Sequence, residues 1–337
     1  MKNPKNLLLV VAGACALASS ATAQIAINTS YVGDIGNTAD TTGYGAVSYG
    51  YHVGTYEVTN SQYASFLNAK ANTDPHGLYN VNMGSNTSGG ISRSGTSGDY
   101  IYSTRENMGD KPVNFLSFWD MTRMANWLTN GQGSGSTETG VYNLTTDGIS
   151  NNTIMRDATA WNNGGVAVAS EDEWYKAAYY DGSGSYFAYA TQSDTEPTAA
   201  TANAIGDISN PGTNVANHSK GAVWNGQSGN VTTVGSAGAE SASHYGTFDQ
   251  SGNIWELNDT IFNSSTRVLR GGFYNNNFST LMDSSSRNNF LPATEYNFAG
   301  FRISSLAPIP EPSTYTAILG ILATTLATMR RKGRRTL

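Results

Sequence analysis

The chain has 337 residues, enough for one large domain or two of ordinary size. Charged residues make up 13% of it, about half of the usual share in globular domains, and Gly, Ser, Thr and Asn take their place. The formal net charge is −6, and no basic patch of the kind that binds nucleic acid is present. The composition therefore excludes a nucleic-acid-binding surface and is typical of an exported protein.

The N-terminal segment 1–23 has the pattern of a secretory signal peptide. Two lysines precede an apolar run, and a small-x-small sequence ends at Ala23, just before Gln24. The run is too short and wrongly flanked for a membrane-spanning helix, so cleavage after Ala23 is expected. A lipoprotein signal at Cys15 is the alternative, but Ala12 stands where such signals carry a large aliphatic residue. Because Cys15 is the only cysteine, the mature chain would have no disulfide and would depend on its core or on a metal ion for stability.

Three short helices are predicted by capping boxes. In this motif a Ser or Thr side chain accepts a hydrogen bond from a first-turn amide, while an acid or Gln three residues later reaches back. The boxes are Thr59/Gln62, Ser117/Asp120 and Ser170/Glu173. Apolar residues follow each box with helical spacing, which predicts one buried face for each helix. The Gly/Ser-rich stretches 84–99 and 131–140 between the helices predict mobile surface loops.

No helical periodicity is visible after residue 185. The stretches TRVLRGGFY (266–274) and FAGFRIS (298–304) are typical of short strands among Asn/Gly turns. No internal repeat with the period of a solenoid or propeller is present. We therefore predict one irregular α+β domain over residues 45–305, preceded by an N-terminal segment, residues 24–44. The arginines of the two strand candidates are expected to make structural ion pairs; they are Arg267, Arg270 and Arg302.

The C-terminal segment 308–337 combines three features. Pro310-Glu311-Pro312 precedes an apolar run of residues 315–329, and five basic residues fall within the last eight. The run is shorter than the ~20 residues of a stable membrane helix, and basic residues after it favour a cytoplasmic tail. An ordinary C-terminal membrane anchor is the alternative. Without both ends, residues 24–309 contain 12 basic and 24 acidic residues, a formal net charge of −12 that suits cation binding and solubility.

This order of Pro-Glu-Pro, short apolar helix and basic tail resembles the PEP-CTERM sorting signal. The resemblance implies a transient membrane span at the C-terminus and recognition and cleavage by an exosortase. The protein would then be released or attached at the outer surface of a Gram-negative envelope or in the extracellular matrix.

Six segments of the body follow one another in a fixed order. They are VGTYEVTNSQYASFLNA (53–69), KPVNFLSFWDMTRMANWL (111–128), ASEDEWYKAAYYDG (169–182), GTFDQSGNIWELND (246–259), RVLRGGFYNNN (267–277) and NFAGFRIS (297–304). Together they resemble the formylglycine-generating-enzyme, or sulfatase-modifying-factor, domain family. The resemblance implies an irregular C-type-lectin-like fold, loop-rich with short strands and few helices, which agrees with the elements predicted above.

The resemblance also implies a structural calcium ion in the loop FDQSGNIWE. Side-chain oxygens of Asp249 and Glu256 and carbonyl oxygens of Gly252 and Ile254 would bind it. Calcium prefers six to eight hard oxygen ligands and mixes carboxylates with carbonyls, so this set is chemically suitable. An ordinary exposed turn with two solvated acids is the alternative.

A second calcium site is implied upstream of this loop. Its ligands would be Asn203, the carbonyl oxygen of Ala204, and Asn225, where the match of Asn225 depends on a one-residue shift.

The aerobic oxidase of this family uses two active-site cysteines that bind copper shortly after the Gly-Gly block. The corresponding stretch here, GGFYNNNFSTLMDSSSR (271–287), contains no cysteine. A soft thiolate pair selects Cu(I), so no copper and no formylglycine-forming activity are expected. Related members use a three-histidine iron site, but the four histidines here form no close-spaced pair; they are His52, His76, His218 and His244.

The sequence thus predicts an exported, calcium-braced and non-catalytic domain that binds polysaccharide or another envelope ligand. Tyr and Asn side chains combine flat apolar area with adaptable hydrogen bonds. The predicted ligand surface lies in the former active-site groove and consists of Tyr274, Asn275, Asn276 and Asn277. An enzyme of altered oxidoreductase chemistry in the same groove is the alternative, which bound copper or iron would indicate.

Overall fold

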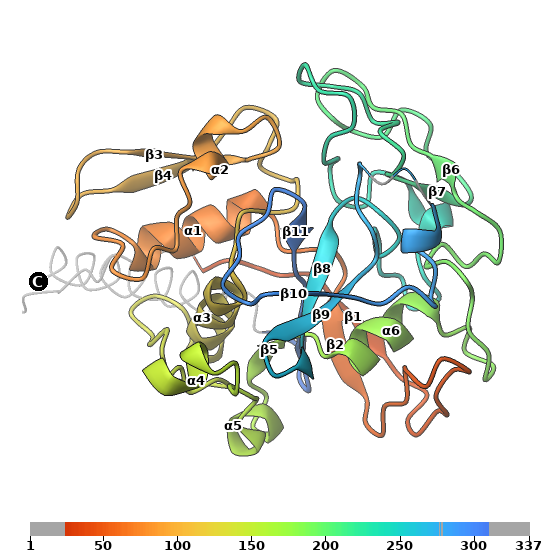
Figure 1. Ribbon diagram of the computed structural model, residues 1–337, viewed down its shortest axis with the longest axis horizontal. Helices are drawn as coiled ribbons and strands as arrows, with labels where there is room; N and C mark the ends of the chain where they lie inside the picture. The colour runs from red at the N-terminus through yellow and green to blue at the C-terminus, as the bar shows by residue number, and fades with distance from the viewer. Residues whose placement is uncertain (1–23, 276, 278, 310–337) are drawn as a thin grey trace, which may run out of the picture.

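A computed structural model describes residues 24–275, 277 and 279–309 (Figure 1). The predicted signal peptide, the sorting motif Pro310-Glu311-Pro312 with the apolar run after it, and Asn276 lie outside the described residues. In the part of the chain that is described, no helix has the length and apolarity to cross a membrane.

Two small four-stranded sheets form the centre of the molecule. The first has the order β1-β2-β12-β5 and the second the order β10-β9-β8-β11. Their strands are β1 (Thr29–Val32), β2 (Tyr51–Gly54), β5 (Val166–Val168), β8 (Trp255–Asn263), β9 (Thr266–Arg270), β10 (Asn288–Phe290), β11 (Ala299–Gly300) and β12 (Ile303–Ser305). Only Phe301 and Arg302 separate β11 from β12, so this short segment joins the two sheets and places Arg302 at their junction.

The first strand shows where the domain begins. β1 pairs antiparallel with β2, with Thr29 opposite Gly54, and the preceding residues Ile25 and Ile27 are buried in the core. Residues 24–44 therefore belong to the same folded body, which differs from the predicted boundary at residue 45. A long loop separates the two paired strands in the sequence, and no local pattern within β1 reveals the pairing.

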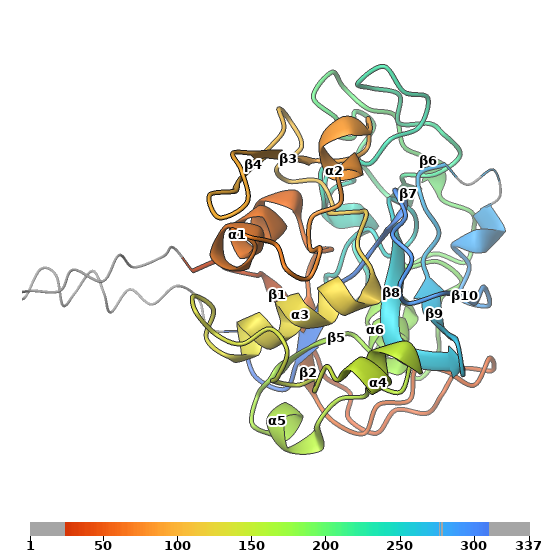
Figure 2. The same ribbon diagram turned by 60° about the vertical axis from the view of Figure 1, so that its left-hand side comes forward.

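The three predicted helices are present. They are α1 (Asn60–Lys70), α3 (Phe118–Thr129) and α6 (Glu171–Tyr179), and both hydrogen bonds of each capping box are formed. α1 lies beside α3, which packs against β5, whereas α6 packs against β8 and β2 (Figures 1 and 2). Three single-turn helices were not predicted, namely α2 (Asn82–Ser85), α4 (Thr146–Ser150) and α5 (Ala158–Asn162).

The stretch 84–99 differs from the mobile loop that its composition predicts. β3 (Ile91–Ser94) lies within it and pairs with β4 (Ile101–Thr104) to form a hairpin. The hairpin is anchored because the side chains of Ile91 and Tyr102 are buried in the core with those of α1. The few apolar residues among Gly and Ser are therefore sufficient to form a strand, although the composition of the stretch predicts a loop.

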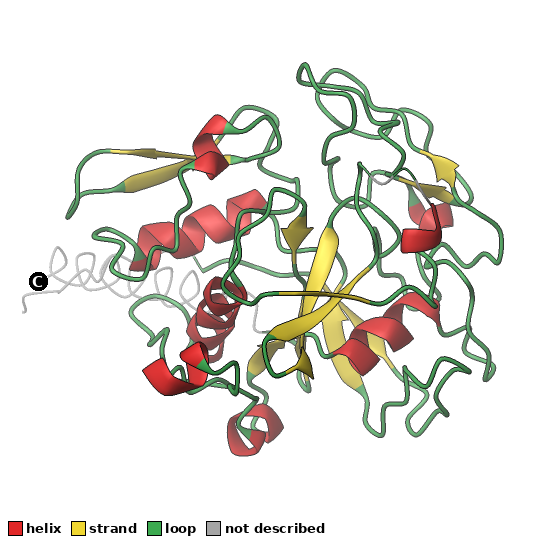
Figure 3. Ribbon diagram, in the orientation of Figure 1, coloured by secondary structure: helices red, strands yellow, loops and turns green. Residues whose placement is uncertain are grey.

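Most of the remaining chain is loop (Figure 3). Residues 190–245 hold only short elements: β6 (Thr198–Ala199), β7 (Val215–Ala216) and a 3-10 helix (Ala239–Ser241). A second 3-10 helix, Ser279–Leu281, follows β9. The prediction of an irregular, loop-rich α+β fold with few helices and short strands is confirmed.

A large aromatic core holds these loops in place. Phe66 of α1, Phe118 of α3 and Trp174 of α6 are fully buried. Truncating a buried Phe or Trp to Ala typically costs about 3–5 kcal/mol. Packing of this kind can stabilise a chain whose body contains no cysteine.

Candidate functional site

The loop from Asp249 to Glu256 has a fixed backbone. Asp249 (φ +64°), Gly252 (φ +96°) and Asn253 (φ +55°) all adopt left-handed conformations. The amide of Gly252 donates to the carbonyl of Gly271 (2.7 Å). A Cβ atom at Gly252 would lie 2.4 Å from the carbonyl oxygen of Asn217, so only glycine fits there.

Two carbonyl groups of this loop lack backbone partners. Gly252 and Ile254 are buried, yet within the described chain their carbonyl oxygens accept no backbone hydrogen bond outside regular secondary structure. Buried carbonyl groups are nearly always paired. Both oxygens are therefore available to a cation, and calcium is the ion that most readily takes backbone carbonyls together with carboxylates.

The carboxylate of Glu256 accepts hydrogen bonds from other side chains of the protein. Its Oε1 accepts a hydrogen bond from Nη2 of Arg302 (2.6 Å) and its Oε2 accepts one from Nε of Arg302 (2.7 Å). Oε2 also accepts a bond from Nε1 of Trp174 (2.9 Å), and Glu256 and Arg302 are both fully buried. The expected structural ion pair of Arg302 is confirmed. A metal ion at Glu256 would have to share this carboxylate with Arg302, and its role as a calcium ligand stays a prediction.

Two more carboxylates lie close to this pair. Glu57 is only 1% exposed; its Oε1 accepts from Nδ2 of Asn253 (3.1 Å), whereas no described residue bonds its Oε2. Asp249 accepts a hydrogen bond from the amide of Gly235 (2.5 Å). Burial, followed by repulsion from Asp249 and Glu256, raises the pKa of Glu57 well above its usual value. Burial also raises the pKa of Asp249 to about 6.

The charges around the loop do not balance. Glu57, Asp249 and Glu256 would carry three negative charges when ionised, whereas Arg302 supplies one positive charge. A divalent cation would remove the excess. No group of three His, Cys, Asp or Glu side chains is placed to share one ion among the residues the structure describes, so an ion here would draw on the carbonyls of Gly252 and Ile254. On these grounds the residues present fit calcium, with Glu57 as a candidate ligand that sequence reasoning missed.

The second predicted calcium site has a different arrangement. Oδ1 of Asn203 accepts hydrogen bonds from the amides of Ile205 (3.0 Å) and Asp207 (3.0 Å), so it serves its own turn. Ala204 and Asn225 both line a polar hollow of about 260 Å³. Nδ2 of Asn225 donates to the carbonyl of Thr87 (3.1 Å). The second calcium site therefore stays a prediction, in which Oδ1 of Asn203 would have to be shared with its own turn.

The predicted ligand groove needs one correction. Tyr274 is only 1% exposed; it packs in a small apolar cluster, and its hydroxyl accepts a bond from Asn297 (3.1 Å). Its ring therefore cannot serve as an exposed contact surface. Asn275 and Asn277 are exposed as predicted, and Asn276 lies outside the described residues.

A row of partly exposed aromatic side chains begins one residue before Tyr274. We call it the aromatic row; its members are Phe273, Phe298, Tyr296 and Phe290. Successive ring centroids along the row are 4.8, 4.8 and 4.6 Å apart. Its residues come from the ends of β9 and β10 and from the segment before β11, which lie near one another in Figure 1. The sequence contains these aromatics, but only the fold brings them together.

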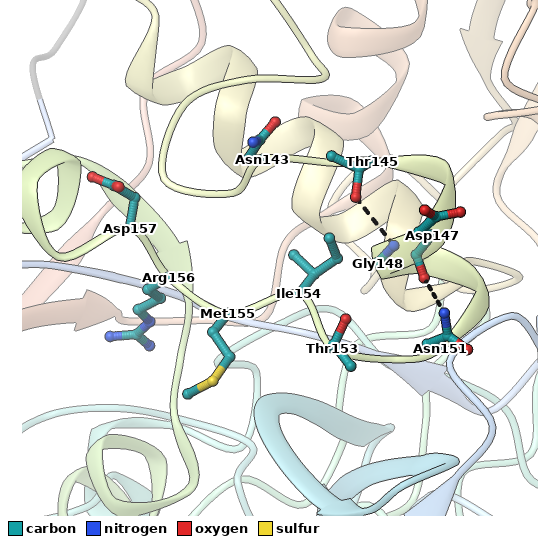
Figure 4. Close-up of a pocket in the computed structure, with 10 residues that line it drawn as sticks. All are labelled: Asn143, Thr145, Asp147, Gly148, Asn151, Thr153, Ile154, Met155, Arg156 and Asp157. Atoms are coloured by element: carbon teal, nitrogen blue, oxygen red, sulfur yellow. Dashed lines mark hydrogen bonds between the residues drawn. The ribbon is translucent and has the colours of Figure 1, made fainter.

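The hollow shown in Figure 4 has a volume of about 650 Å³ and is lined by residues between Asn143 and Asp157. Asp147 and Asn151 lie at one end of it, and Arg156 and Met155 toward the other. The side chains of Thr145 and Asp157 cap α4 and α5 by accepting hydrogen bonds from first-turn amides.

The arginine of this hollow is also engaged. Nη2 of Arg156 lies 2.7 Å from Oε2 of Glu173, and its Nε contacts Asp259. A second hollow of about 410 Å³ shares Met155 and Arg156. The side chains of Thr145, Asp157 and Arg156 stabilise the fold through these contacts, and we assign no ligand to either hollow.

The other strand arginines differ from one another. Arg270 forms the expected ion pair, with Nη2 lying 2.6 Å from Oε1 of Glu171. Arg267 does not: Nε donates to Asn152 (2.8 Å), Nη2 to the carbonyl of Ile154 (2.6 Å), and the guanidinium stacks 4.1 Å from the ring centre of Phe118. The prediction of an ion pair is wrong for Arg267, and burial lowers its pKa to about 10.

The histidines are dispersed. His218 is buried, with Nε2 2.9 Å from the carbonyl of Pro197 and Nδ1 2.8 Å from the hydroxyl of Ser219. His244 and His76 are exposed, and His52 is partly exposed. No described histidine belongs to a metal-binding group.

Comparison with known proteins agrees with the order of the six segments. Residues 12–305 match the sulfatase-modifying factor enzyme 1-like domain, the FGE-sulfatase family, and the chain belongs to this family. No curated protein matches the sequence.

Similar solved structures include Treponema denticola variable protein 1, with 16% identity, 83% of this chain and 95% of that chain covered, and a TM-score of 0.49. CarF has 19% identity, with 85% and 97% covered and a TM-score of 0.47. PvdO from Pseudomonas aeruginosa has 15% identity, with 82% and 90% covered and a TM-score of 0.42.

Proposed function

We propose that this member of the sulfatase-modifying factor enzyme 1-like domain family is an exported, calcium-braced binding protein and does not generate formylglycine. One observation carries the proposal. The stretch after Gly271-Gly272, where the family's oxidase would have its copper-binding thiolates, contains Asn, Ser and Thr but no Cys. Hard oxygen and amide groups do not select Cu(I) as a thiolate pair does.

Calcium bracing is supported by the geometry of the loop 249–256. A bound ion would supply the positive charge that Glu57 and Asp249 lack. The protein's own residues would do the positioning: Gly252 allows the turn, the backbone bonds to Asn217 and Gly271 hold it, and Arg302 fixes Glu256. The ion would then connect this loop to the junction between the two sheets.

A glycan ligand is supported by the aromatic row and its surroundings. Aromatic rings present large apolar surface that can pack against the C–H faces of a sugar ring. The exposed amides of Asn275 and Asn277, together with the partly exposed amides of Asn288 and Asn289 on β10, can bond hydroxyl groups. The body is strongly acidic, which disfavours anionic polymers. We therefore favour a neutral polysaccharide of the envelope or the extracellular matrix.

Export and sorting complete the proposal. The signal peptide pattern and the Pro310-Glu311-Pro312 motif support passage across the inner membrane and handling by an exosortase. The body has a low share of charged residues and a net negative charge, which suits an extracellular surface.

The test is retention on immobilised glycan. The full chain, purified after export, should be retained on neutral exopolysaccharide, and Tyr296→Ala should weaken binding about tenfold, since an aromatic contact contributes up to about 1.5 kcal/mol. Phe262→Ala is the matched control because Phe262 is an exposed aromatic outside the row. Circular dichroism in the near ultraviolet reports folding. Absence of retention by a folded wild-type chain would refute the glycan ligand.

An enzyme of altered chemistry in the same groove is the competing function. Elemental analysis separates the two, because stoichiometric copper or iron in the purified chain would favour catalysis. Conversion of a cysteine-containing peptide to formylglycine would overturn the chemical argument directly.

A further inference from the structure

Lys111 is a buried lysine whose side chain ends at the turn of residues 203–207. Only 2% of the residue is exposed. Its Nζ donates to the carbonyl of Ile205 (2.8 Å) and to the hydroxyl of Thr233 (2.7 Å). The hydroxyl of Thr233 in turn donates to Oδ1 of Asp207 (2.6 Å). The ammonium is thus linked to a carboxylate through one hydroxyl group.

The ammonium also lies over an aromatic ring. Nζ of Lys111 is 4.8 Å from the ring centre of Trp224. Lysine above an indole face is a favourable cation–π arrangement, and it strengthens when the pair is desolvated. Lys111 therefore has a carbonyl, a hydroxyl and a ring around its charge, which is the kind of environment that a bound metal ion or ammonium ion occupies.

The turn is built around this side chain. Asn203 accepts the amides of Ile205 and Asp207, which orients the carbonyl of Ile205 toward Nζ. Gly206 has φ +81°, and a Cβ atom there would lie 2.8 Å from Cε of Lys111 and 2.5 Å from the ring of Trp224. A residue with a side chain at this position would collide with the lysine and the ring, so the turn admits the lysine only because residue 206 is glycine.

From these contacts we infer that the ammonium of Lys111 takes the place of the second calcium ion, so that a built-in cation holds the turn of residues 203–207. Of the ligands expected for that ion, Oδ1 of Asn203 is already engaged, because it accepts hydrogen bonds from the amides of Ile205 and Asp207 in its own turn. A divalent ion near Nζ would be repelled by the ammonium. This inference does not rest on glycan binding, because it concerns which cation holds a turn.

The ammonium of Lys111 has a carboxylate partner within the turn itself. Asp207 provides the carboxylate that Lys111 reaches through Thr233. Burial lowers the pKa of Lys111, and the carboxylates of Asp207 and Asp110 oppose that lowering. The cluster at residues 203–207 is therefore self-contained, in contrast to the excess of carboxylates around residues 249–256.

The first test compares two lysines. Lys111→Met removes the charge and keeps the length of the side chain, and should lower Tm by at least about 5 °C, because hydrogen bonds from charged groups are among the stronger ones. The matched control is Lys220→Met, since Lys220 is exposed. Unchanged melting of a folded Lys111→Met chain would overturn the inference.

The second test counts calcium in the full chain by equilibrium dialysis with CaCl₂. Asn203→Ala should leave the number of bound ions unchanged, and Asp249→Asn should remove every tightly bound ion. Loss of one bound ion in the Asn203→Ala chain would overturn the inference, whatever the outcome of glycan binding.

If Lys111→Met does not fold, nuclear magnetic resonance of the wild-type chain with ¹⁵N-labelled lysine replaces it. A slowly exchanging ammonium signal that Thr233→Val shifts is expected. An ammonium signal that exchanges as fast as those of exposed lysines would contradict the proposed burial of the charge.

Discussion

Two clusters of oxygen atoms in this protein differ in the source of their positive charge. Around residues 249–256, Glu256 forms an ion pair with Arg302, and the carboxylates of Glu57 and Asp249 add two further acidic groups. Among the described residues, no backbone hydrogen bond outside regular secondary structure reaches the carbonyls of Gly252 and Ile254. Around residues 203–207, a lysine ammonium already fills the centre of the cluster. One lysine side chain can therefore hold a turn in place, a role that the family resemblance assigns to a metal ion.

The pKa values of two buried carboxylates show the effect of a matching cation. Glu173 is fully buried, but its ion pair with Arg156 outweighs burial and lowers the pKa to about 2. For Asp249, burial prevails and raises the pKa to about 6. The difference lies in the matching cation, because desolvation penalises both carboxylates. The loop 249–256 is thus a place where buried carboxylates lack a matching positive charge.

The largest expected effect is at the junction of the sheets. Arg302→Met would leave Glu256 buried without its partner and should destabilise the chain by about 3–5 kcal/mol in urea unfolding. Arg302→Lys keeps the charge but loses the bidentate geometry. Its free energy of unfolding should therefore lie between those of the wild type and Arg302→Met. A loss below about 1 kcal/mol for Arg302→Met would show that the loop does not depend on its internal cation.

A paired carboxylate should make stability depend on pH in the acid range. The folded pKa of Glu173 is lower than its ordinary value of 4.5, so its contribution is present above pH 4.5 and is lost as the pH falls toward 2. The shift corresponds to about 3 kcal/mol. Urea unfolding between pH 5 and pH 2 should show this loss in the wild type and in exposed Glu240→Gln, but not in Glu173→Gln. Parallel curves for all three chains would contradict the assignment.

Calcium removal should have a comparable but smaller effect. At a free calcium concentration of about 100 Kd, an ion that binds only the folded chain stabilises it by about 2.7 kcal/mol. Addition of EGTA should then lower Tm by about 5–10 °C. Asp249→Asn should melt at the same temperature with and without EGTA. If EGTA leaves wild-type melting unchanged, the proposal of a calcium brace fails.

The smallest effect on stability is expected at the turn of residues 203–207, where Lys111 supplies the positive charge. Asn203→Ala removes two hydrogen bonds to backbone amides and should cost about 1 kcal/mol. The EGTA-induced shift in Tm should remain that of the wild type, because Asn203 holds a turn and not an ion. A reduced EGTA shift in this variant would place a calcium ligand at Asn203 and erase the contrast between the clusters.

Local signals gave the predictions that the structure confirms. Each capping box is a short local motif, so Thr59, Ser117 and Ser170 marked helix starts without knowledge of the rest of the chain. The order of six segments indicated the family, and with it the irregular fold. The family resemblance also pointed to the loop 249–256, whose acids and glycine are neighbours in sequence, and its role as a calcium site stays a prediction.

The features that were missed depend on contacts between distant segments. Glu57 and Asp249 lie far apart in the sequence, and neither segment alone predicts their proximity. Lys111 reaches residues 205 and 233, and its burial cannot be inferred from a solitary lysine before a proline. For Tyr274 the error has the opposite sense. The Asn-rich stretch predicted an exposed ring, but the ring packs in a buried apolar cluster with Trp224.

The connection from β11 to β12 has a consequence for the order of folding. β12 lies between β2 and β5, so the first sheet is complete only with residue 305, and the second sheet is complete only with β11, which ends at Gly300. Both sheets are therefore completed by the last strands of the described chain. In the exported protein that we propose, such late closure would leave both sheets incomplete while the polypeptide passes through a translocation channel.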